Sequence, residues 1–196
     1  MKPLPLLFSF AALALLAGCG VQDIPRAKND VDAKTANLTS EYKRRADLVP
    51  QLIGAVSGNA KHERGTLEAV VNARAKATSI TLDPSNATPE QLRAYQGAQG
   101  QLSQALGRLM MVTENYPNLK ANEAFLDLQA QLEGTENRIK IARQDLITSI
   151  QGFNDLVTVF PDSLTNQWFY HYGKMAQWDV DAGEKKSDET APEVKF

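Results

Sequence analysis

The chain has 196 residues, of which 43% are hydrophobic and 22% are charged, a composition typical of a folded globular domain rather than a disordered or collagen-like chain. Its formal net charge of −2 gives no basic surface for phosphate backbones, so we expect no nucleic-acid partner. One Cys excludes an internal disulfide, and with two His it cannot build the usual zinc sites. We therefore expect no metal and no cofactor.

The first residues have the order of a bacterial secretory signal. Lys2 precedes an apolar run from Leu4 to Leu16, and two small residues follow. The run suits the apolar core of a signal peptide and is shorter than the roughly 18 residues that a spanning helix needs. Leu16-Ala17-Gly18-Cys19 resembles the bacterial lipobox, in which the signal is cut before the cysteine and the cysteine carries a lipid. We expect residues 1–18 to be a lipoprotein signal peptide and Cys19 the lipid attachment site; the alternative is a free thiol.

The expected lipid would hold the protein on a membrane without a spanning helix. Several acyl chains on Cys19 form a stable anchor, because each buried CH₂ contributes about 0.8 kcal/mol. The domain would then face the extracytoplasmic side of a bacterial membrane. Gly20, in place of Asp, resembles the pattern of lipoproteins exported to the outer membrane, so in a Gram-negative host we expect the periplasmic side of that membrane.

Between Val21 and Ala77 the chain is rich in helix formers, and its apolar residues recur at intervals of three and four. This spacing places them on one face of a helix, as a packing seam. Pro50 lacks a backbone N–H and would clash with the carbonyl of residue 46, so we expect a bend near Leu48 and a helix that continues beyond it. A loop over 78–86 follows. The seam residues are Ile24, Val31, Leu38, Tyr42, Val49, Leu52 and Val56.

The next helix begins at Thr88. Thr88 can cap free N–H groups, Pro89 suits the first helical position, and Gln91 completes a capping box. We expect this helix to end at Pro117, with a seam of Leu92, Tyr95, Leu102, Leu109 and Tyr116. Three glycines disfavour a helix interior, and we expect them to allow a neighbouring helix to approach closely; the alternative is a locally loose helix. These are Gly97, Gly100 and Gly107.

The clearest pattern in the chain is a strict seven-residue repeat of apolar residues, preceded by Asn122 as a cap and stopped by Pro161. An unbroken helix over this repeat is about 52 Å long at 1.5 Å per residue. Its partner helices must therefore also be long, antiparallel and lightly supercoiled, which predicts an all-α antiparallel bundle. The repeat consists of Phe125, Leu132, Ile139, Leu146, Phe153 and Phe160.

Residues 162–172 favour one short C-terminal helix, capped by Asp162 or Ser163 and ended by Gly173. Both tryptophans and two tyrosines fall within residues 168–178. We expect them to cover the end of the bundle; the alternative is a membrane-interface or partner-docking surface. We expect residues 174–196 to form a flexible charged tail, which leaves 19–173 as one helical bundle domain.

Charged residues interrupt the apolar seams. Arg45 occupies a seam position and Glu136 lies beside Ile139, and a charge that faces a helix interior must find a partner or carry a large desolvation cost. We hypothesise that such residues form a structural polar layer that fixes the register of the helices, a known device in helical bundles. The hypothesised layer consists of Arg45, Asp47, Glu136, Asn137 and Arg143.

Several motifs resemble those of the LemA family. They are Asn37-Leu38, the run from Tyr42 to Leu52, His62-Glu63, Asn72-Ala73-Arg74, the run from Tyr116 to Glu123, Glu136-Asn137-Arg138-Ile139, and Phe153-Asn154 followed by Phe160-Pro161. The resemblance covers about residues 21–161 and returns at the final Val194-Lys195-Phe196. It implies a membrane-anchored antiparallel helical bundle with no established biochemical activity. This chain departs from the family in its lipobox, where most members carry an N-terminal transmembrane helix, and in the aromatic stretch after Leu164.

No motif supports catalysis. His62-Glu63 begins an HExxH-like pattern, but Thr66 stands in place of the second His, which excludes that zinc-protease motif. His171 lies among aromatic residues, and two scattered histidines give no Ser/His/Asp set. The sequence contains neither GxxxxGK nor GxGxxG before a helix, the motifs that cradle phosphates. We expect no catalytic residue and no enzyme.

These observations favour a non-catalytic scaffold or adaptor in the bacterial cell envelope, with the membrane as one partner and an envelope protein as another. The alternative is a binding module for a small hydrophobic or peptide ligand between the helices, and a hydrolase with an unrecognised site is a third interpretation. Long heptad seams can also be satisfied between two chains, so a homo-oligomer stays open.

Overall fold

The computed structural model describes residues 21–57, 63–81 and 87–178. Within these ranges the chain is helical and contains no strand, so the expected all-α bundle of long helices is confirmed. The elements are α2 (Asp23–Ser57), α3 (Arg64–Ser79), α4 (Pro89–Thr113), α5 (Pro117–Lys120), α6 (Glu123–Thr158), α7 (Asp162–Thr165) and the π-helical turn η1 (Asn166–Tyr170).

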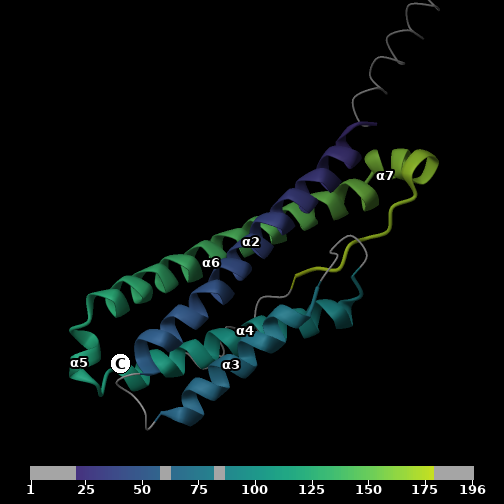
Figure 1. The fold of residues 1–196 in the computed structure, drawn as a ribbon. Coiled ribbons are helices and arrows are strands. Elements are labelled where there is room, and N and C mark those ends of the chain that lie inside the picture. The colour runs from purple at the N-terminus through teal and green to yellow at the C-terminus, as the bar shows by residue number, and fades with distance from the viewer. Residues whose placement is uncertain (1–20, 58–62, 82–86, 179–196) are drawn as a thin grey trace, which may run out of the picture.

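The bundle consists of two helix pairs (Figure 1). The antiparallel helices α2 and α6 pack against each other, α3 packs against α4, and α3 also contacts α2. The 35 residues of α2 make a rod about 52 Å long at 1.5 Å per residue. The short α5 connects α4 to α6 at one end of this rod, and α7 lies at the opposite end, where α2 begins (Figure 1).

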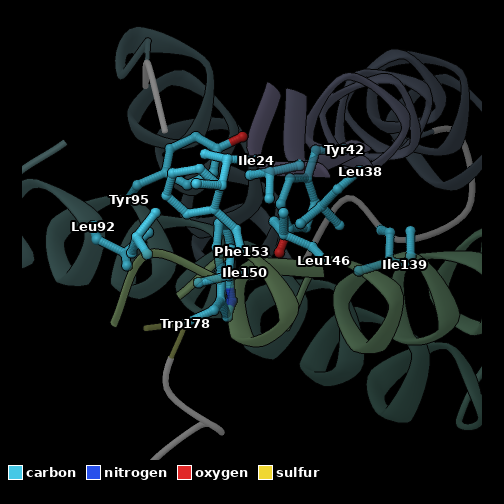
Figure 2. Close-up of a cluster of buried hydrophobic side chains, with 13 residues drawn as sticks. Ile24, Leu38, Tyr42, Leu92, Tyr95, Ile139, Leu146, Ile150, Phe153 and Trp178 are labelled. Atoms are coloured by element: carbon cyan, nitrogen blue, oxygen red, sulfur yellow. The ribbon is translucent and has the colours of Figure 1, made fainter. Parts of the chain in front are cut away.

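Two apolar clusters hold the helices together. The first core, near the start of α2, is shown in Figure 2 and combines Ile24, Val31, Leu38, Tyr42, Leu92, Tyr95, Ile139, Ala142, Leu146, Ile150, Phe153, Val157 and Trp178. The second core, nearer α5, combines Val49, Leu52, Val56, Val70, Ala77, Leu102, Ala105, Leu106, Leu109, Leu119, Phe125 and Leu132. The residues of the expected α2 seam are all buried, because the repeat keeps them on the face that meets α6 and α4.

The expected continuation of the helix beyond Pro50 is confirmed, because α2 runs through Pro50 to Ser57, and the bend near Leu48 stays a prediction. Pro50 cannot donate to the carbonyl of Ala46, which would leave a costly unpaired acceptor. Arg74 of α3 supplies the missing donor, since its Nε donates to that carbonyl at 2.7 Å. A side chain from a neighbouring helix thus compensates for the proline.

The capping box at Thr88 and Gln91 is present, and the side chain of Asn122 accepts a hydrogen bond from the amide of Phe125 at 3.2 Å. Both expected helix starts are therefore confirmed. The ends differ, because α4 ends at Thr113 rather than Pro117 and α6 ends at Thr158. Phe160, the last member of the predicted repeat, consequently lies beyond the helix and is 74% exposed.

The glycines of α4 do not serve a close helix approach, so that expectation is wrong. A Cβ atom added at Gly97, Gly100 or Gly107 would meet no atom within 4 Å outside the local backbone. Each faces open space.

The C-terminal segment also departs from the sequence-based expectation. α7 runs into η1, and the helix ends at His171, whose φ of 57° is left-handed, rather than at Gly173. Residues beyond the expected domain limit at 173 then pack back onto the bundle, where Trp178 is only 5% exposed. The helical bundle therefore extends at least to Trp178, and the remaining residues assigned to the tail, 179–196, lie outside the described part of the chain.

Two asparagines fasten this returning segment. Asn154 accepts from the amide of Met175 at 2.8 Å and donates to its carbonyl at 3.0 Å. Asn166 accepts from the amide of Tyr172 and donates to its carbonyl, both at 2.9 Å. Each side-chain amide thus satisfies both backbone groups of one residue, which fixes an otherwise irregular stretch.

Candidate functional site

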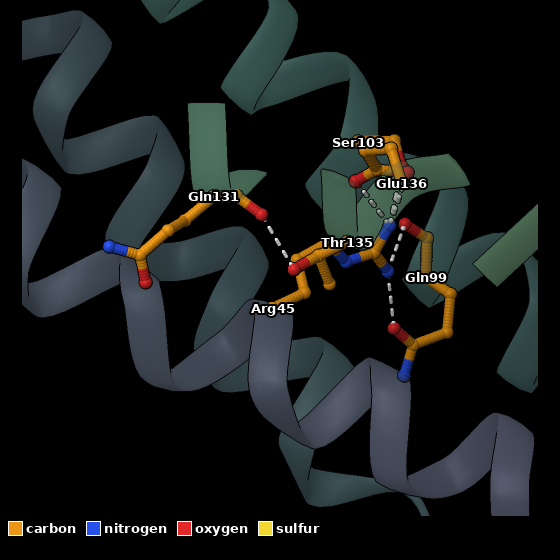
Figure 3. Close-up of polar contacts among 6 residues, drawn as sticks. All are labelled: Arg45, Gln99, Ser103, Gln131, Thr135 and Glu136. Atoms are coloured by element: carbon orange, nitrogen blue, oxygen red, sulfur yellow. Dashed lines mark hydrogen bonds and ion pairs between the residues drawn. The ribbon is translucent and has the colours of Figure 1, made fainter. Parts of the chain in front are cut away.

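A cluster of polar side chains separates the two apolar cores. At its centre is Arg45 of α2, which is 1% exposed. Its Nη1 donates to Ser103 Oγ at 2.5 Å and to Glu136 Oε1 at 3.0 Å, and its Nη2 donates to Gln99 Oε1 at 2.6 Å. Figure 3 shows the guanidinium between α4 and α6, with these partners around it. The ion pair and hydrogen bonds offset the cost of taking a cation out of water.

The cluster extends to all four long helices. Gln99 Nε2 donates to the carbonyl of Ala77 at the end of α3, at 3.1 Å. The guanidinium carbon of Arg45 lies 5.1 Å from the centre of the Tyr42 ring, a distance suited to a cation–π interaction. Of the three nitrogens of this guanidinium, Nη1 and Nη2 have hydrogen-bond partners and Nε has none. These contacts identify a structural junction rather than a site with reactive groups left open.

The sequence-predicted polar residues divide into those in the cluster and those outside it. Arg45 and Glu136 form the ion pair at 3.0 Å. Asp47 and Asn137 are exposed on α2 and α6, and Arg143 is partly buried further along α6. The other side-chain partners of Arg45 are Gln99 and Ser103, and both come from α4.

Sequence reasoning missed three polar residues in this region: Gln99 and Ser103 in the junction, and Thr135, whose hydroxyl donates to the carbonyl of Gln131 on its own helix. A signal was present for Gln99, which follows Tyr95 by four positions and precedes Leu102 by three, so it lies on the α4 seam. Thr135 is likewise spaced by three and four residues between Leu132 and Ile139 on α6 and is fully buried. A polar residue at a seam position indicates an interior partner.

A groove lies beside the junction, between α2, α3 and α4. Its volume is about 350 Å³, and its lining residues are Thr39, Tyr42, Lys43, Ala46, Asp47, Ala77, Thr78, Ile80, Thr81, Tyr95 and Gln99. Burial raises the pKa of Tyr95 to about 12, so its hydroxyl stays protonated at physiological pH. The rings of Tyr42 and Tyr95 meet edge to face, with centres 5.8 Å apart, and form an aromatic wall with hydroxyl and charged groups at the rim.

The aromatic residues near the C-terminus have two opposite environments. Trp178 packs edge to face on Tyr95, and Tyr170 and Tyr172 stack on each other against the first core. Three of the four tryptophans and tyrosines in residues 168–178 are therefore packed on the first core, with Trp178 beside Tyr95. Trp168 is instead 70% exposed, and Phe169 beside it is 64% exposed.

Other sequence-based interpretations concern membrane and metal sites. No helix among the described residues has the length and apolar character needed to cross a bilayer. In the same part of the chain, no group of three or more His, Cys, Asp or Glu side chains could hold a metal ion. The predicted lipid site Cys19, the signal peptide 1–18 and His62 lie outside the described residues.

A family model and one curated relative of this chain carry the same family name. A family model described as the LemA family matches residues 34–196. The chain is 22% identical over 146 residues to Protein LemA of Metamycoplasma hominis, a match that covers 74% of this chain and 60% of that protein. It is 25% identical to Magnetosome protein MamQ of Magnetospirillum gryphiswaldense and 26% identical to Magnetosome protein MamQ 2 of Paramagnetospirillum magneticum, each over 67% of this chain and 55% of the relative. The chain thus spans little more than half the length of the curated relatives it matches.

Proposed function

The chain belongs to the LemA family, and we propose that it acts as a membrane-anchored, non-catalytic scaffold or adaptor in the bacterial cell envelope. The observation that carries this proposal is a long, internally braced bundle whose first helix, α2, begins at Asp23, four positions after the expected lipid site at Cys19. The polar junction uses its buried charge to hold α2, α4 and α6 together. Such a rod would present its α5 end about 50 Å from the anchored end.

The lipid anchor is the first part of the proposal. We propose that residues 1–18 are removed, that Cys19 carries the lipid, and that the domain faces the extracytoplasmic side, on the outer membrane in a Gram-negative host. Growth with an alkyne fatty acid should label the protein and direct it to the membrane fraction. Cys19→Ser should abolish the label and release the protein from that fraction. Labelling that persists in Cys19→Ser contradicts an anchor at this residue.

The adaptor role is the second part, and the end of the bundle near α5 offers a site to test it. Met111, near the end of α4, is 69% exposed, and Leu126, near the start of α6, is also exposed. A photo-crosslinking amino acid at position 111 should capture a discrete envelope protein in cells. The matched control carries the same group at Ile141, which is 63% exposed in the middle of α6.

If the protein is an adaptor, a crosslinked envelope protein should be captured from position 111 and not from position 141. This capture should require an intact Cys19. Identical products from both positions, or products unchanged by Cys19→Ser, contradict a specific anchored adaptor. Capture of a second copy of the same chain would identify a homo-oligomer instead.

The groove beside the junction favours a second candidate function, a binding module for a small hydrophobic or peptide ligand. The α4 glycines do not line this groove, so its walls are formed by side chains of α2, α3 and α4 and not by space left open at glycines. Native mass spectrometry of the detergent-free protein should detect a co-purified molecule if this function holds. Thr39→Trp, which adds bulk to the groove wall, should remove that mass; retention of the mass contradicts binding in the groove.

A further inference from the structure

More than half of the exposed large apolar side chains in the described part of the chain lie in one short segment after α6. Five large hydrophobic residues between positions 159 and 169 are exposed within the described part of the chain, namely Val159, Phe160, Leu164, Trp168 and Phe169. We call this group the aromatic end. Concentrated exposed apolar residues mark an interaction site more often than single scattered ones do.

The aromatic end is fixed beside the start of α2. The hydroxyl of Tyr170 donates to the carbonyl of Val21 at 2.7 Å, and Figure 1 shows α7 next to the first turns of α2. Tyr170 also stacks on Tyr172, which packs against the first core. Trp168 and Phe169, on the same turn, therefore hold a set position relative to Val21.

The position of Val21 limits how far the aromatic end can lie from an anchored membrane. Cys19 precedes Val21 by two residues, and two residues of fully extended chain span at most about 7 Å. A lipid on Cys19 would hold Val21 within that distance of the cysteine backbone. The turn that Tyr170 fastens to Val21 would consequently lie at the level of the lipid headgroups.

The chemistry of the aromatic end suits this location. Trp is enriched where a protein meets the membrane–water interface, and Phe and Leu gain free energy when an interfacial helix places them among acyl chains. The charges within five positions of the aromatic end are Asp155, Asp162 and Lys174, two acidic and one basic, so the segment has no excess of positive charge. Attraction should therefore depend on apolar burial and little on anionic lipid.

We infer that the aromatic end inserts into the interfacial layer of the bilayer and forms a second membrane contact beside the lipid. This inference rests on the anchor at Cys19 proposed above. Two contacts restrict the tilt of the bundle, whereas a lipid alone lets it swivel. The membrane would thus help to orient the end of the rod near α5.

The test uses the lipidated full-length protein in phosphatidylcholine vesicles with brominated acyl chains, which quench tryptophan fluorescence inside the bilayer. The wild-type protein should lose part of its emission, because Trp168 reaches the lipid while Trp178 stays buried in the first core. Trp168→Phe removes only an exposed ring and should abolish most of this quenching. The quenching should be the same at low and high salt, since apolar contacts are not screened.

A matched control moves the exposed indole. Trp168→Phe combined with Ile141→Trp places a tryptophan 17 positions before the α6 end at Thr158, about 25 Å along the helix, and should show no added quenching. Vesicle flotation is recorded for every sample. Flotation without quenching of Trp168 overturns the inference and leaves the anchor standing, whereas failure of the lipidated protein to float overturns both.

Discussion

The polar junction in the middle of the bundle and the aromatic end differ in which large side chains are buried. In the junction, Arg45 is removed from water and surrounded by Gln99, Ser103 and Glu136. At the aromatic end, Trp168 and Phe169 remain in solvent although the first core lies close by. Arg45 is the residue with the larger cost of burial, yet it is the buried one.

This difference indicates that the junction stabilises the fold, whereas the aromatic end is available to contact another surface. A buried cation with three side-chain partners contributes to one arrangement of the helices, because any shift of register leaves it unpaired. An exposed tryptophan contributes little to folding and is free to meet another surface. Variants in the junction should therefore change stability, and variants at the aromatic end should change membrane contact.

The largest expected effect comes from the junction. Arg45→Leu removes the donor that Gln99, Ser103 and Glu136 share, and should reduce the free energy of unfolding by about 3 kcal/mol. For a protein of this size the melting temperature should fall by roughly 10 °C. Arg44→Leu removes a charge from the exposed neighbouring position and is the control. Unchanged melting temperatures for both Arg45→Leu and Glu136→Leu would show that the polar layer has no structural role.

The second-largest loss of stability is expected from a variant that releases the C-terminal segment from α6. Asn154→Ala removes both hydrogen bonds to Met175 and should cost about 2 kcal/mol. Trp178 should become more mobile, so the emission maximum should move to longer wavelength. Gln151→Ala, at an exposed position one turn earlier in α6, should change neither property. An unshifted emission maximum in Asn154→Ala would mean that other contacts hold the segment.

A smaller effect is expected where α3 compensates for Pro50. Arg74→Met leaves the Ala46 carbonyl without its donor and should cost about 1.5 kcal/mol in chemical denaturation. In a Pro50→Ala background, residue 50 regains an N–H for that carbonyl, so Arg74→Met should cost about 1 kcal/mol less. Equal costs in the two backgrounds would contradict the coupling between Arg74 and Pro50.

The smallest effect on stability is expected at the aromatic end. Trp168→Ser should change the free energy of unfolding by less than about 0.5 kcal/mol, because the ring packs against little in the folded state. The melting temperature in detergent-free buffer should match that of the wild type within about 2 °C. A larger decrease in melting temperature would show that Trp168 contributes to the stability of the fold, as Arg45 is expected to do.

Much of the fold was predictable because its signals are local. The seven-residue repeat of α6 and the caps at Thr88 and Asn122 depend on residues only a few positions apart. The pairing of Arg45 with Glu136 was also anticipated, since each charge interrupts an apolar seam. Asp47 and Asn137 lie outside the junction, because each position rotates a side chain by about 100° around the helix: Asn137 is one position from Glu136, and Asp47 is two positions from Arg45.

Periodicity and capping act within one or two helical turns, so the helical class, the buried faces and the starts of α4 and α6 follow from the order of the residues alone. The packing of the helices sets how Pro50 is accommodated, which α4 residues complete the junction, and which tryptophan is exposed. These contacts join residues far apart in the chain: Arg74 reaches Ala46 across 28 positions and Tyr170 reaches Val21 across 149. Such contacts exist only after the helices have packed, so no local pattern encodes them.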